Sequence, residues 1–238
     1  MDAVRAFREE AVGGCAPMSL CARILKGTAV EHFRMLSDER GRKLSWVSPP
    51  DQVAQLVAES ATPRDWMLAI GYDPVWLDAR IADGTEFKLA LFPVAGGATS
   101  GAFPVTWDSL LDRVPELFGP AIAAAVEPHR AALKSKPYEE VDPDGAICAV
   151  TLLPAAEKLA DPRYMTSERF TERISSNVDG PPSCTLFEAR AFLYHSVGCS
   201  KLFRGDGFGV NGGAEWAIPN RPIDSIPGLS LFPFDPRC

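Results

Sequence analysis

The sequence predicts a helix-rich α+β protein with a mixed sheet of about five strands, folded as a single compact domain over residues 1–238. Segments with helical periodicity outnumber segments with strand alternation, and the two kinds follow one another in mixed order. The clearest strand is Glu86–Val94, where apolar and other residues alternate. No glycine fingerprint leads from a strand into a helix, so a looser α/β arrangement is only the alternative.

Composition narrows the class of protein. The chain has 238 residues, 46% hydrophobic and 23% charged, which is typical of a globular protein and not of a disordered one. The net charge of −7 argues against broad binding to nucleic acid or to anionic membranes, because both need a cationic surface. We therefore expect no membrane partner and do not expect nucleic acid.

Six cysteines are present, and none form a CxxC pair. The N-terminal sequence MDAVRAFREEAVGG is charged and lacks the apolar core of a signal peptide. No apolar stretch approaches the ~20 residues that span a bilayer. The sequence thus predicts a soluble, cytoplasmic protein with reduced cysteines. It indicates no particular cofactor.

The first half of the chain divides into segments with clear boundaries. A helical region is expected over Ser19–Leu36, divided near Gly27, because its apolar residues allow a helical stripe. Prolines and turn residues separate the elements that follow. These are a short strand at Leu44–Val47, helices at Asp51–Ser60 and Pro74–Ala82, and the strand at Glu86–Val94.

The second half is expected to be mostly helical. Thr106 should cap a helix over Trp107–Phe118, and the helix that starts at Pro120 should end or kink at Pro128. The polar stretch at 134–145 is the best candidate for an internal boundary. Ala146–Leu153 is apolar without alternation and is bounded by glycine and proline, which is typical of a buried strand.

The helix at Thr185–Val197 is apolar on almost every side and should be central. His195 lies near its end and is a candidate acid or base; Cys199 is a candidate nucleophile if the helix continues past Gly198. The alternative is a histidine and a cysteine satisfied by packing and a backbone carbonyl. Cys184, His195 and Cys199 match no standard zinc spacing, so no metal site is predicted.

The glycine-rich stretch at 200–213 follows this helix. Its Lys201 and Arg204 could hold an anion, and Asp206 could bind a metal or a hydroxyl. Glu215, at the start of a strand, is a second candidate catalytic carboxylate, and Trp216 beside it is a candidate substrate contact. The alternatives are an ordered surface loop and a solvent-facing strand position.

Two functions are compatible with these features. The first is a soluble enzyme, a transferase or hydrolase, that acts on a small anionic substrate at the glycine-rich C-terminal segment. The alternative is a non-catalytic interaction or accessory protein that uses its proline-rich tail to bind a protein partner. The tail carries large apolar residues, so we expect it to lie extended over the core.

Overall fold

The structure is a computed structural model that describes residues 20–27, 34, 42–94, 100–176, 180–198 and 215–237. The chain divides into two compact units: unit 1 is Met1–Asp38, Ser45–Pro104 and Val210–Cys238, and unit 2 is Glu39–Leu44 and Val105–Gly209. A single domain with an internal boundary near 134–145 stays a prediction.

Unit 1 is built on an antiparallel sheet with the strand order β1-β3-β6. The strands are β1 (Leu20–Gly27), β3 (Glu86–Pro93) and β6 (Ser230–Pro233). Ile24 pairs with Leu89 across the first pair of strands, and Leu89 pairs with Phe232 across the second. Both faces of the central strand are buried, which suits its apolar sequence.

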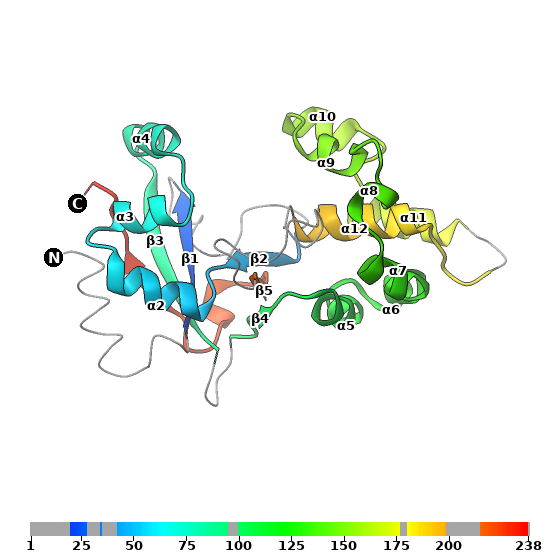
Figure 1. Cartoon of the computed structure of the whole chain (residues 1–238), viewed down its shortest axis with the longest axis horizontal. Helices are drawn as coiled ribbons and strands as arrows, with labels where there is room; N and C mark the ends of the chain where they lie inside the picture. Colours follow the sequence, from blue (N-terminus) through cyan, green and yellow to red (C-terminus); the bar gives the residue numbers. More distant parts are fainter. Residues whose placement is uncertain are drawn as a thin grey trace. The chain divides into compact units, whose positions relative to one another are not determined.

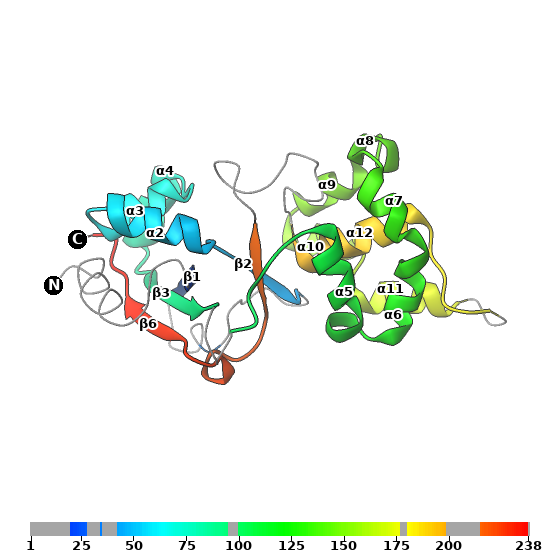
Figure 2. The ribbon, with the colours of Figure 1, turned by 60° about the horizontal axis from the view of Figure 1, so that its bottom comes forward.

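Three helices cover one face of this sheet (Figures 1 and 2). They are α2 (Pro50–Glu59), α3 (Pro63–Ala69) and α4 (Pro74–Ala82), and each begins with a proline in its first turn, where the missing N–H costs nothing. Trp66 and Met67 are fully buried in the core that these helices form with the sheet.

A second small sheet has the order β2-β5-β4, formed by β2 (Leu44–Val47), β5 (Trp216–Pro219) and β4 (Phe103–Pro104). Ile218 of β5 joins Phe92 and Cys21, from the other face of the first sheet, in one apolar cluster. This cluster anchors the strand that follows the glycine-rich stretch.

Unit 2 is helical and is organised around α12 (Leu186–Val197), as Figure 1 shows. The chain reaches α12 through α5 (Trp107–Phe118), α6 (Pro120–Val126), a 3-10 turn (Glu127–His129), α7 (Arg130–Ser135), α8 (Tyr138–Val141), α9 (Ala146–Thr151), α10 (Ala155–Ala160) and α11 (Ser167–Ser175). Phe192 of α12 stacks on Phe170 with ring centroids 4.2 Å apart and meets Phe118 edge-on at 4.9 Å. The expectation of a central helix is confirmed.

The α+β class is confirmed, but the strands form two three-stranded sheets and not one mixed sheet. Two element assignments are wrong. Leu20–Gly27 is a strand within the expected helical region, because pairing with β3 buries both of its faces. Ala146–Thr151 is a helix within the expected strand, because Asp142 accepts hydrogen bonds from the backbone N–H groups of Ala146 and Ile147 and so starts a helix there.

The C-terminal tail lies extended against unit 1, as expected. Its strand β6 pairs with β3, and the Phe234 side chain that follows is 1% exposed. The Phe234 ring meets Trp66 edge-on at 5.9 Å. Among the residues that the structure describes, no helix is long and apolar enough to cross a membrane.

Candidate functional site

His195 is sealed in the interior of unit 2, with 4% of its surface exposed. Its Nδ1 accepts a hydrogen bond from the Met165 N–H at 2.9 Å, and its Nε2 donates to the Ile147 carbonyl at 3.0 Å. These partners fix the neutral tautomer, and burial lowers the pKa of the imidazole. Both ring nitrogens are thus engaged, so this geometry favours the structural alternative. The catalytic role stays a prediction without support from the described contacts.

Glu215 and Trp216 lie in unit 1, whereas His195 lies in unit 2. Glu215 is half-buried and immediately precedes β5, as the sequence predicted. Trp216 pairs with Pro104 across the sheet and packs against the apolar cluster around Ile218. The indole of Trp216 therefore has a packing role in unit 1.

The remaining predicted site residues lie outside the described part of the chain: Cys199, Lys201, Arg204 and Asp206. Helix α12 ends at Val197, and Gly198 follows with φ 107°, a conformation that favours glycine. The predicted alignment of His195 with Cys199 needed the helix to continue past this glycine, and it does not.

Two described thiols are poor nucleophiles. Burial raises the pKa of Cys21 to about 12 and that of Cys184 to about 11. A thiol with such a pKa is almost entirely protonated at neutral pH, and only the thiolate attacks. The Cys184 thiol instead donates to the Ala125 carbonyl at 3.2 Å.

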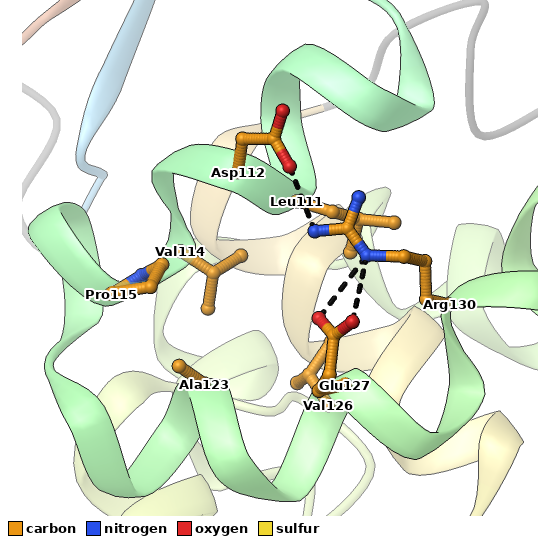
Figure 3. Close-up of a pocket in the computed structure, with 8 residues that line it drawn as sticks. All are labelled: Leu111, Asp112, Val114, Pro115, Ala123, Val126, Glu127 and Arg130. Atoms are coloured by element: carbon orange, nitrogen blue, oxygen red, sulfur yellow. Dashed lines mark hydrogen bonds and ion pairs between the residues drawn. The ribbon is translucent and has the colours of Figure 1, made fainter.

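A pocket of about 360 Å³ lies within unit 2, between α5, α6 and the start of α7 (Figure 3). Its lining residues are Leu111, Asp112, Val114, Pro115, Ala123, Val126, Glu127 and Arg130. Thr106 and Ser109 form a reciprocal cap that starts α5, and Gly119, with φ 91°, ends it and turns the chain into α6. These two ends fix how α5 and α6 face each other around the pocket.

The apolar part of the pocket comes from the facing sides of α5 and α6. Figure 3 shows Val114 and Pro115 across from Ala123 and Val126. The side chains of Val114 and Val126 are almost fully buried, whereas Ala123 is half-buried. Because alanine leaves space where a larger side chain would fill the gap, the groove stays open at Ala123.

One wall of the pocket is an ion cluster around Arg130. The Arg130 Nε donates to both carboxylate oxygens of Glu127 at 3.0 and 3.1 Å, and its Nη2 donates to Asp112 at 2.8 Å (Figure 3). Its Nη1 lies 3.5 Å from Asp108, which also pairs with Lys134 at 2.7 Å. The hydrogen bond with Asp112 raises the pKa of Arg130. The guanidinium is thus occupied by carboxylates and is not free to bind an anion.

Pro115 lies inside α5 and also lines this pocket. Proline has no N–H, so the carbonyl of Leu111, four residues earlier, lacks its usual helical partner. Leu111 and Pro115 both line the pocket. The lining also carries two carboxylates, on Asp112 and Glu127, against the single guanidinium of Arg130.

The two carboxylates of this pocket, Asp112 and Glu127, are both paired with Arg130. The lining of the pocket includes no cysteine, histidine or hydroxyl. No group of three metal-ligating side chains occurs among the described residues. The pocket was not predicted from the sequence. The signals that point to it are a proline inside a predicted helix and the spacing of three residues between Glu127 and Arg130.

Comparison with known proteins gives no match: no family model, no curated protein and no solved structure is similar to the chain.

Proposed function

We propose that the protein is a non-catalytic binding protein whose pocket between α5 and α6 takes a small amphipathic cation. The ligand is an ammonium group on a short apolar stem. The observation that carries the proposal is the excess of acceptors: Arg130 already donates to Glu127 and Asp112, while the Leu111 carbonyl has lost its helical donor to Pro115. A ligand there must supply hydrogen-bond donors.

Charge supports the same ligand. The lining carries two carboxylates and one guanidinium, so its own charge is negative. An ammonium group complements that charge and has three donors and no acceptor. Its apolar stem would lie against Val114, Ala123 and Val126, and each buried methylene contributes about 0.8 kcal/mol. A four-carbon stem with one partly solvated ion pair then corresponds to a dissociation constant on the order of 1 mM.

The test is a titration of the full chain with n-butylammonium chloride, followed by the amide ¹H–¹⁵N NMR spectrum. We expect saturable shifts of pocket amides with millimolar affinity, and no such shifts with sodium pentanoate, which has the same four-carbon stem and the opposite charge. Equal responses to both compounds, or none to butylammonium, would contradict the proposal.

Two adjacent alanines provide matched variants. Ala123→Leu places a larger side chain in the pocket and should abolish the butylammonium shifts. Ala124 is the exposed neighbour on the same helix, so Ala124→Leu should leave them unchanged. Binding that survives Ala123→Leu in a folded protein would place the ligand elsewhere.

The enzyme that acts on an anionic substrate stays a prediction, because its anion-binding residues Lys201 and Arg204 lie outside the described residues. A protein-binding tail is less well supported, since Phe234 and β6 pack against unit 1. A cytoplasmic location also stays a proposal; the free thiols of Cys21, Cys148 and Cys184 support it.

A further inference from the structure

Arg190 is a buried cation with little to compensate its charge. It lies on α12 with 3% of its surface exposed. Its Nη1 donates to the Pro137 carbonyl at 3.3 Å, and its Nε, although buried, has no hydrogen-bond partner. Burying a charge without a counter-ion is costly, and an unsatisfied donor adds to that cost.

Two aromatic rings contact the guanidinium. Its central carbon lies 5.6 Å from the centroid of the Trp107 ring and 5.7 Å from that of Tyr138. Trp107 and Tyr138 are both half-buried, whereas the arginine between them is buried. Cation–π contacts offset part of the desolvation, but rings accept no in-plane hydrogen bonds from the guanidinium.

The nearby carboxylates are engaged elsewhere. Asp142 accepts from the Ala146 N–H through Oδ1 and from the Ile147 N–H and the Tyr138 hydroxyl through Oδ2. Glu139 is exposed, and within the described chain no ion pair joins either carboxylate to Arg190. Their charges act on the guanidinium only at longer range, and burial lowers the pKa of Arg190 overall.

From this geometry we infer that unit 2 holds an oxyanion site, in which the Nε and Nη2 edge of Arg190 binds a carboxylate or phosphate between Trp107 and Tyr138. This edge presents two parallel N–H groups, the arrangement that matches two oxygens of one anion. The site is independent of the pocket between α5 and α6, which selects the opposite charge. The sequence predicts an anionic ligand at the glycine-rich stretch. The site at Arg190 would bind such a ligand at a different place, in unit 2.

The experiment follows the arginine Nε ¹H–¹⁵N resonances of the full chain during titration with sodium acetate, sodium phosphate or sodium chloride at constant ionic strength. We expect a saturable downfield shift of the Arg190 resonance, while that of the exposed Arg163 stays in place. A response to acetate alone identifies a carboxylate, a response to phosphate alone identifies a phosphate, and a response to both identifies any small oxyanion. No shift with either, or the same shift with chloride, overturns the inference.

Arg190→Met adds a second measurement. Replacing a poorly paired buried cation by an apolar side chain of similar length is often tolerated, so we expect this variant to fold. At ten times its dissociation constant, the anion should lower the unfolding equilibrium constant of the wild type about tenfold and leave that of Arg190→Met unchanged. An equal effect on both proteins would overturn the inference. The resonance titration uses the wild type and decides the question even if the variant does not fold.

Discussion

The Tyr138 hydroxyl donates a 2.5 Å hydrogen bond to the carboxylate of Asp142, which is 2% exposed. The same carboxylate accepts from the backbone N–H groups that start α9, so one acidic side chain joins α8 to α9. Burial, together with the hydrogen bond to Asp142, raises the pKa of Tyr138 well above the usual value for tyrosine. The phenol is therefore a hydrogen-bond donor over the whole neutral range.

Tyr138→Phe should destabilise the protein by about 1.5–3 kcal/mol, because it removes a donor from a buried, charged acceptor. Urea denaturation measures the change in unfolding free energy. A double-mutant cycle with Asp142→Asn isolates the pair, and we expect a coupling energy above about 1 kcal/mol. Additive effects of the two substitutions would show that the hydrogen bond contributes nothing of its own.

The buried His195 predicts a pH dependence of stability. The pKa of the His195 imidazole is lowered in the folded protein. At pH values between this lowered pKa and the unfolded value of about 6.5, the imidazole therefore takes up a proton in the unfolded chain but not in the folded one. Stability from this group is therefore complete above pH 6.5 and is lost as the pH falls toward the folded pKa. The loss is at most about 1.4 kcal/mol per pH unit.

Urea midpoints at pH 7.5 and 5.5 measure this loss, with His195→Gln as the comparison because glutamine does not titrate. We expect the variant to be less stable at pH 7.5 and its midpoint to change less between the two values. Parallel pH profiles for the two proteins would mean that His195 titrates normally in the folded state.

The packing of the tail predicts a large effect from a residue near the C-terminus. Phe234→Ala should cost about 3–5 kcal/mol, because it leaves a cavity beside Trp66 in the core of unit 1. Leu231→Ala, at a side chain that is 38% exposed on the same segment, should cost under about 1 kcal/mol. Similar small losses for both variants would show that the tail is not part of the core.

Local signals predicted much of the fold. Thr106 caps its helix where the sequence indicated, and Pro128 interrupts its helix by a 3-10 turn. Long-range contacts decided the exceptions. The strand at Leu20–Gly27 depends on pairing with a segment 59 to 73 positions away, and no local pattern of apolar residues encodes that partner.

The candidate site was harder to predict for the same reason. The sequence drew attention to His195 because histidine titrates near neutral pH, but only the structure shows that Met165 and Ile147 occupy both ring nitrogens. Arg130 and Arg190 looked like ordinary arginines. What distinguishes them is the three carboxylates around Arg130 and the two aromatic rings around Arg190. All of these groups lie outside the helix that carries the arginine they surround.

Pro115 should affect both the stability of α5 and the affinity for the proposed ligand. Pro115→Ala restores an N–H that can bond to the Leu111 carbonyl, and a proline inside a helix costs up to about 3 kcal/mol. We expect the variant to be more stable by about 1–3 kcal/mol. The gain is smaller than the full cost of the proline, because alanine makes the unfolded chain more flexible and so favours unfolding. The affinity for butylammonium should fall about 2- to 10-fold, because one acceptor is withdrawn.

Urea denaturation and the NMR titration measure the two effects on the same protein. Pro120→Ala is the control, because Pro120 occupies the first turn of α6, where no helical hydrogen bond is missing. That variant should change stability by under about 1 kcal/mol and leave binding as it is. If Pro115→Ala is stabilised but binds butylammonium as tightly as the wild type, the Leu111 carbonyl is not part of the site, and the carboxylates of Asp112 and Glu127 alone must hold the cation.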